Sequence, residues 1–219
     1  MLIERPPKWF RALFPGVMFR MPASGEKPGR VFLTFDDGPI PEVTPWVLDL
    51  LDIYDVKATF FMVGQNVERY PFLLEEVVNR GHCVANHSLH HIRGLGISPR
   101  RYVEDVDRCE VYTKSGIFRP PHGFLTPFQL RALKKKYKVV MFDVVTRDYS
   151  KRVTARDVVE NVKKYARDGS LIVFHDSLKS RRKLLTALPQ SLEWLIDNGF
   201  SFDVLASTNS LFQDSRFNS

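Results

Sequence analysis

Aspartate, histidine and arginine, the side-chain types that carry acid–base and metal chemistry, follow five short apolar runs of this sequence. Asp36 and Asp37 end the first of these runs, and two histidines four residues apart, His87 and His91, follow another. The remaining runs are followed by Arg119 and His122, by Asp148 and Tyr149, and by His175. Polar residues scattered over a surface would not all lie at the ends of apolar runs, so the pattern predicts a functional site.

Two histidines and one carboxylate are a common ligand set for a catalytic Zn²⁺ ion, with a fourth position left for water. Such a metal lowers the pKa of its water towards ~7 and polarises a carbonyl oxygen. The adjacent carboxylates Asp36 and Asp37 point in different directions from an extended backbone. One of them can therefore ligate the metal while the other takes a proton from the water, and a separate histidine can protonate the leaving group. This combination predicts hydrolysis of an amide or an ester.

The elements that must position these residues are seven β-rich runs that alternate with six helical patterns. The runs are residues 31–35, 58–63, 82–86, 117–119, 139–144, 171–174 and 200–205. Strict alternation predicts parallel strands joined by helical crossovers, hence an α/β fold. The chain length favours a short TIM-like barrel of about seven strands over a doubly wound open sheet. In a barrel the strand ends lie on one rim, where active sites are built.

Five motifs in the order TFDDGP, HSLHH, RPPHG, TRDY and LIVFHD resemble those of the polysaccharide deacetylases, the NodB-homology domain or carbohydrate esterase family four. The resemblance extends over about residues 30–205. It implies a distorted (β/α) barrel that removes N- or O-acetyl groups from sugar polymers with a divalent metal. We expect Zn²⁺ as that metal, with Co²⁺, Ni²⁺ and Mn²⁺ as alternatives.

The resemblance also implies roles for the first three motifs. Asp36 resembles the catalytic base, and Arg119 resembles the arginine that orients the carboxylate of this base. The three residues that resemble metal ligands are Asp37, His87 and His91.

Further roles follow from the later motifs. His175 resembles the general acid and Asp148 the carboxylate that tunes it, while Val173 takes the place of a residue that receives the acetyl methyl group. His122 stands where the family usually has tyrosine, and the implied role belongs to its backbone N–H, which stabilises the oxyanion. Tyr149 replaces a usual tryptophan, which alters the wall of the pocket.

For three of these residues, the sequence alone leaves a structural interpretation open. His175 can be a buried histidine bonded to backbone, Arg119 can brace the end of a helix, and Asp148 can be an ordinary loop carboxylate.

Length and composition predict one folded domain. The chain has 219 residues, 44% hydrophobic and 26% charged, which is close to the globular average. We expect a domain at residues 28–206, preceded by a basic, aromatic arm at 1–27 and followed by a polar tail at 207–219. Its two cysteines cannot make a disulfide framework.

The net charge of +7 gathers in basic clusters that can attract anionic partners, although solvated helix faces explain such clusters more simply. Nucleic-acid binding would rest on this charge alone, and we do not expect it. In the arm, aromatic and basic residues suit a membrane surface, but we favour an arm that packs across the N-terminal face of the barrel.

Pro15 and Gly16 interrupt the apolar run near the N-terminus, so the signal-peptide pattern is poor. We expect a cytoplasmic protein, with peripheral contact at the inner membrane face as an option.

The leading hypothesis is a metal-dependent deacetylase of N-acetylated sugars in oligo- or polysaccharide. One alternative keeps the mechanism and changes the substrate to a formylated or acetylated lipid-linked sugar at the cytoplasmic membrane face. Another alternative is a non-catalytic carbohydrate-binding barrel. The oligomeric state has no signature in the sequence.

Overall fold

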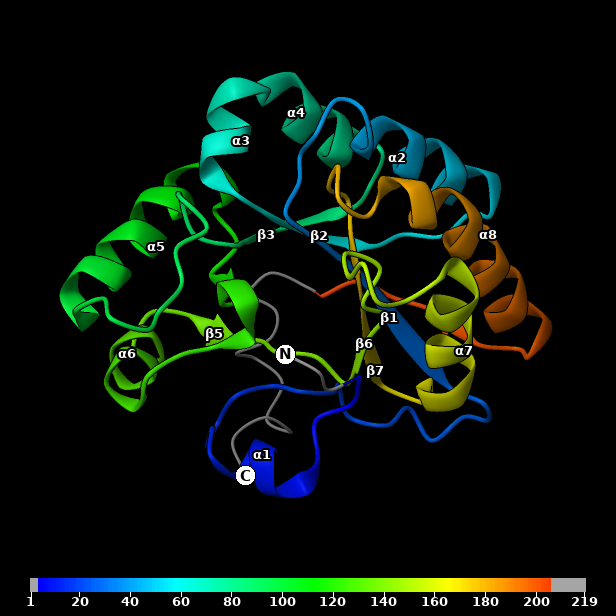
Figure 1. Ribbon diagram of the computed structural model, residues 1–219, viewed down its shortest axis with the longest axis horizontal. Helices are drawn as coiled ribbons and strands as arrows, with labels where there is room; N and C mark the ends of the chain where they lie inside the picture. The colour runs from blue at the N-terminus through cyan, green and yellow to red at the C-terminus, as the bar shows by residue number, and fades with distance from the viewer. Residues whose placement is uncertain (1–3, 206–219) are drawn as a thin grey trace.

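The computed structural model describes residues 4–205, in which helices surround a curled sheet of parallel strands (Figure 1). The strands are β1 (Arg30–Asp36), β2 (Thr59–Met62), β3 (Cys83–Asn86), β4 (Ile117–Phe118), β5 (Lys138–Val139), β6 (Val144–Val145), β7 (Ser170–His175) and β8 (Ser201–Phe202). The helices are α1 (Lys8–Ala12), α2 (Thr44–Ile53), α3 (Gly64–Arg69), α4 (Pro71–Asn79), α5 (Pro99–Thr113), α6 (Pro127–Leu133), α7 (Ala155–Tyr165) and α8 (Arg181–Asp197). The predicted tail, residues 207–219, lies outside the described residues.

The sheet confirms the predicted α/β architecture of parallel strands and gives it the form of a half-barrel. Its strand order is β5-β4-β3-β2-β1-β7-β6, and β8 pairs with the start of β1. β1 lies near the centre, and alternate side chains point to opposite faces of this strand. Phe35 stacks on Phe60 and Phe174 of the neighbouring strands beneath the helices, with ring centroids 5.0 and 5.9 Å apart. The next residue, Asp36, therefore points into the barrel.

The predicted single strand at residues 139–144 is wrong in its extent, because this segment changes partners along its length. β5 pairs with β4, whereas β6, five residues further on, pairs with β7. β5 and β6 are thus the two ends of the sheet, and the segment between them crosses its open side. A local sequence pattern detects an apolar run but not a change of pairing partner within it.

The N-terminal arm fills this open side of the half-barrel. Met18 forms a parallel bridge with Val140, and Arg20 an antiparallel bridge with Ser170 at the start of β7. Phe14 and Phe19 are buried in a cluster with residues of α5, α6 and the segment after β5. The rings of Phe14 and Phe19 thus pack into the barrel, along its seam.

Three of the eight helices within residues 4–205 begin at a residue whose side chain caps them. Thr126 and Thr154 form capping boxes at α6 and α7, and Ser98 accepts a hydrogen bond from the backbone of α5. Two helices, α3 and α4, stand where one was expected, because Pro71 forces the preceding residue out of helical geometry. No helix within residues 4–205 is long and apolar enough to span a membrane.

Candidate active site

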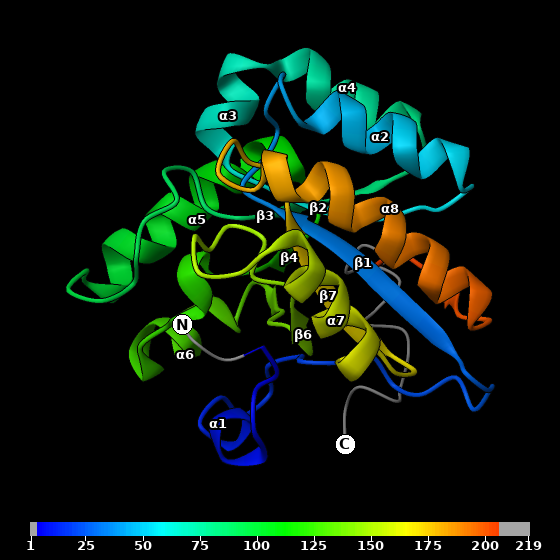
Figure 2. The ribbon, with the colours of Figure 1, turned by 45° about the vertical axis from the view of Figure 1, so that its right-hand side comes forward.

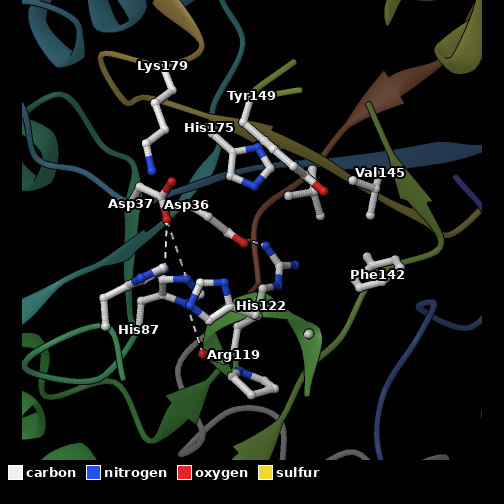
Figure 3. Close-up of a pocket in the computed structure, with 14 residues that line it drawn as sticks. Asp36, Asp37, His87, Arg119, His122, Phe142, Val145, Tyr149, His175 and Lys179 are labelled. Carbon is white, nitrogen blue, oxygen red and sulfur yellow. Dashed lines mark hydrogen bonds and ion pairs between the residues drawn. The ribbon is translucent and has the colours of Figure 1, made fainter. Parts of the chain in front are cut away.

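The residues singled out by the sequence meet at the rim formed by the C-terminal ends of the strands. They line a cavity of about 210 Å³ (Figure 3). Nine of the ten predicted residues lie in its wall: Asp36, Asp37, His87, His91, Arg119, His122, Tyr149, Val173 and His175. The tenth, Asp148, is buried behind His175. The cavity is smaller than the ~300–1,000 Å³ of a site for a drug-sized ligand, so it suits a small group whose remainder lies outside.

A buried ion pair between Asp36 and Arg119 forms the floor of the cavity. The Nη1 of Arg119 donates to Oδ1 of Asp36 at 2.6 Å and to Oγ1 of Thr34 at 2.8 Å. Its Nη2 donates to the carbonyl of Met141 at 3.0 Å, and its guanidinium lies 3.9 Å from the ring centroid of Phe61. Burial lowers the pKa of Arg119, while the carboxylate of Asp36 acts in the opposite direction. The guanidinium thus fixes the direction of the Asp36 carboxylate, which leaves its other oxygen for chemistry.

Asp37 points away from Asp36 because the backbone turns sharply after β1. Its φ is 82°, a conformation that costs a non-glycine residue about 1–3 kcal/mol and needs support from its surroundings. Asn66 supplies support by donating to the Asp37 carbonyl at 2.8 Å. Asp176, which is also buried, accepts from the N–H of Gly38 at 3.1 Å and from the hydroxyl of Thr44 at 2.6 Å. Burial raises the pKa of Asp176 to about 8.

Asp37, His87 and His91 form a cluster with the geometry of a metal site. One ligand atom from each lies within 4.8 Å of the others. Oδ1 of Asp37 is 3.1 Å from Nε2 of His91 and 3.8 Å from Nε2 of His87. The Nδ1 of His87 lies 2.9 Å from the carbonyl of Arg119, and a carbonyl can only accept, so Nδ1 carries the proton and Nε2 keeps its lone pair.

The protonation states of His87 and Asp37 also suit metal binding. Burial lowers the pKa of His87 to about 4, so its imidazole is neutral at pH 7. Burial alone would raise the pKa of Asp37, but the hydrogen bond from His91 and the nearby His175 and His87 outweigh it and hold this pKa well below its ordinary value. Neutral imidazoles and an ionised carboxylate are the forms in which these side chains bind a divalent ion. The residues therefore fit the predicted metal.

His175 and Asp148 form an acid–carboxylate pair on another side of the cavity. The Nδ1 of His175 lies 2.7 Å from Oδ1 of Asp148, and the backbone N–H of His175 donates to Oδ2 at 2.8 Å. Burial would lower the pKa of His175, but the carboxylate of Asp148, followed by those of Asp37 and Asp36, raises it to about 9. The imidazole is thus protonated at neutral pH, with Nε2 free to donate.

An apolar wall faces the polar groups across the cavity. Figure 3 shows Asp37 and His87 on one side and Tyr149, Val145 and Phe142 on the other. The ring of Tyr149 lies 4.7 Å from that of His175, and Val173 adds to the wall.

Two features near the triad complete the lining. His122 lies in the turn Pro121–Gly123 with φ 60°, and its ring centroid is 4.7 Å from that of His91. Lys179, in the loop after β7, points towards Asp37 (Figure 3).

Sequence reasoning missed five lining residues: Pro120, Gly123, Phe142, Val145 and Lys179. Phe142 and Val145 belong to the segment that crosses the open side of the sheet, so their orientation depends on tertiary pairing. The basic run that contains Lys179 was a visible signal, because it directly follows the motif of His175.

Acid–base groups gathered around a triad of metal-ligand type, at the rim of a parallel barrel, place the chain among the α/β-barrel hydrolases. The family model described as polysaccharide deacetylase matches residues 23–141, more than half of the chain. The chain therefore belongs to the polysaccharide deacetylase family.

Individual relatives agree with this assignment. A peptidoglycan-N-acetylglucosamine deacetylase of Bacillus cereus is 33% identical over 180 residues, which cover 78% of this chain and 84% of the relative. A chitooligosaccharide deacetylase of Sinorhizobium fredii is 33% identical over 202 residues, 82% of this chain and 92% of the relative. A crystal structure of a peptidoglycan N-acetylglucosamine deacetylase superposes with a TM-score of 0.82 at 29% identity, over 96% of this chain and 98% of the other. The chain is thus a hydrolase of carbon–nitrogen bonds in carbohydrates, and the non-catalytic alternative has no support from these comparisons.

Removal of one histidine of the triad should abolish tight metal binding. Loss of a residue that only hydrogen-bonds to a metal ligand weakens metal affinity ~10–100-fold, and loss of the ligand itself should cost more. We therefore expect His91→Ala to weaken Zn²⁺ binding by at least about 100-fold in a competition titration with a chromophoric chelator. His90→Ala is the matched control, because His90 contacts Asp105 instead of the triad. Equal affinities of the two variants would show that the triad is not the metal site.

Proposed function

We propose that this chain removes acetyl groups from N-acetylated sugars of oligo- or polysaccharide, with a divalent metal held by Asp37, His87 and His91. The observation that carries the proposal is the arrangement of a base, an acid and a ligand triad around one small cavity. The relatives named above support N-acetylglucosamine units as the substrate, since their names include peptidoglycan-N-acetylglucosamine and chitooligosaccharide. Zn²⁺ suits two imidazoles and a carboxylate, and Co²⁺, Ni²⁺ and Mn²⁺ are alternative occupants.

When bound, the metal supplies a water of lowered pKa and polarises the acyl oxygen. Asp36 accepts the proton of the attacking water through the oxygen that Arg119 does not hold. Since Arg119 holds this carboxylate in a fixed orientation, the base needs no reorganisation before the reaction.

On the leaving-group side, His175 donates its Nε2 proton to the sugar nitrogen as the carbon–nitrogen bond breaks. Asp148 keeps His175 protonated and fixes its ring. His175 and Asp36 are direct neighbours on β7 and β1, so the acid and the base act on one bound group.

The apolar wall and the turn at His122 position the acyl group. Val173, Val145 and Phe142 offer an apolar surface to the acetyl methyl, and Tyr149 closes this side. The backbone N–H of His122 stabilises the oxygen on which negative charge develops. The short wall limits the acyl group to a small one such as acetyl.

Replacement of the base tests the proposal. A general base contributes about 10²–10⁴-fold, so Asp36→Asn should lower the rate of acetate release from N-acetylglucosamine oligomers by at least about 100-fold. Zn²⁺ affinity should stay within about threefold of the wild type, because Asp36 lies outside the triad. A rate within tenfold of the wild type would show that Asp36 is not the base.

The pH dependence tests the role of Asp148. A general acid acts only when protonated, so activity should fall as the pH rises through about 9, the pKa of His175. Asp148→Asn removes the main charge that raises this pKa and keeps the shape of the side chain. The pKa should then fall towards or below the ordinary value of about 6.5, which moves the alkaline limb of the rate profile to lower pH by at least about one unit. Tyr149→Phe, a change beside the same histidine, should leave the limb in place, and an unmoved limb in Asp148→Asn would refute the pairing.

A further inference from the structure

An exposed apolar surface with a basic border lies where the arm meets α6. Trp9 and Leu13, four residues apart on and just after α1, are 65% and 62% exposed. Phe128 on α6 is 75% exposed. Leu13 and Pro127, the neighbour of Phe128, line one groove, so the arm and α6 are in contact. Figure 2 shows α1 and α6 on the same side of the molecule. We name this surface, with its apolar members Trp9, Leu13 and Phe128, the arm–α6 face.

The charged side chains that line the groove of the arm–α6 face are all positive. Lys8 is an exposed neighbour of Trp9, while Arg131, Lys134 and Lys135 line the same groove as Leu13. Lys134 donates to the carbonyl of Pro15, an uncharged partner, so this bond joins the two elements and, among residues 4–205, no carboxylate pairs with its charge. The two stretches that build this face, residues 5–25 and 111–142, contain no aspartate or glutamate.

Two other exposed or half-buried basic residues of these stretches are compensated by carboxylates from elsewhere in the chain. Arg11 pairs with Asp143, and Lys136 pairs with Asp107. The four basic residues of the arm–α6 face thus differ from their neighbours in presenting charge beside exposed apolar side chains.

The exposed side chains of the arm and α6 are arranged as on a surface that lies at a membrane interface. On α6, Phe128 and Arg131 are three residues apart and exposed, while Leu130 and Leu133 are buried. Lys135 lies in the turn that follows this helix. Tryptophan, phenylalanine and leucine beside lysine and arginine are the composition of segments that lie in the headgroup region of a membrane. A soluble polyanion would need the charges alone and would leave three large apolar side chains in water.

We propose that the arm–α6 face docks on the surface of an anionic lipid bilayer. The apolar side chains enter the headgroup region, and the four basic side chains contact lipid phosphates. The occupant is a bilayer because the arm–α6 face combines basic side chains, which complement lipid phosphates, with exposed apolar side chains that suit the headgroup region. The large exposed ring of Phe72, by contrast, lies on α4 with Glu75 and Glu76 three and four residues away.

Vesicle binding tests the proposal. The full chain is sedimented with vesicles of phosphatidylcholine alone and with vesicles that contain about one-third phosphatidylglycerol. We expect binding to the anionic vesicles only, with a blue shift of tryptophan emission that is absent in Trp9→Phe. Binding to neither vesicle would overturn the proposal.

Paired variants separate insertion from charge. Phe128→Ser should weaken binding by at least about tenfold, since a buried aromatic ring contributes a large apolar area, whereas Phe72→Ser should change it less than twofold. Arg131→Gln with Lys135→Gln should also weaken it at least about tenfold, because each basic residue contributes about fivefold. Lys151→Gln with Arg152→Gln carries the same loss of charge at another exposed site and should have a smaller effect.

Three outcomes would overturn the assignment. If the two double variants, at Arg131 and Lys135 and at Lys151 and Arg152, weakened vesicle binding equally and Phe128→Ser did not weaken it, the binding would be a general attraction of a basic protein to a polyanion. A dimer that Phe128→Ser dissociates, without vesicle binding, would assign the face to a second copy of the chain. Equal binding by all variants would place the contact elsewhere. Unchanged thermal midpoints of the variants establish that the losses do not come from unfolding.

Discussion

The buried guanidinium of Arg119 is the interaction on which the rest of the site depends. A charge in the interior depends on its partners, and loss of one partner costs about 3–5 kcal/mol. The two terminal nitrogens of Arg119 find theirs by joining β4 to Asp36 and Thr34 of β1 and to Met141 in the segment that crosses the open side, while its Nε has no hydrogen-bond partner within residues 4–205. Its carbonyl also accepts from His87. One residue thus orients the proposed base and fixes the tautomer of a proposed metal ligand.

A second constraint separates the two adjacent carboxylates. The strand places Asp36 inside the barrel, and the positive φ of Asp37 turns that side chain towards the histidines. Asp176 binds Gly38 so closely that a Cβ atom there would lie 2.0 Å from its carboxylate. The two carboxylates therefore remain in different environments, which is the condition for giving them different roles.

The sequence predicted what depends on local pattern and missed what depends on distant partners. The apolar runs located most strands, and the capping threonines located the starts of α6 and α7. The five motifs located the ten residues that the structure brings together. The change of partner between β5 and β6 has no local signature, since both halves of the segment are equally apolar. Nor did any pattern show that Asp176 supports the loop of Asp37, or that Phe142 and Val145 face the cavity, because these contacts form only when the barrel curls and the arm closes its seam.

The central claim is that one divalent ion at Asp37, His87 and His91 enables removal of acetyl groups. It is tested most directly by adding Zn²⁺ stepwise to metal-free protein while acetate release from N-acetylglucosamine oligomers is followed. The account predicts that the rate rises in proportion to added metal and levels off at one equivalent per chain, because one triad holds one ion. Full activity of the metal-free protein, or no release with one equivalent bound at the triad, would contradict it.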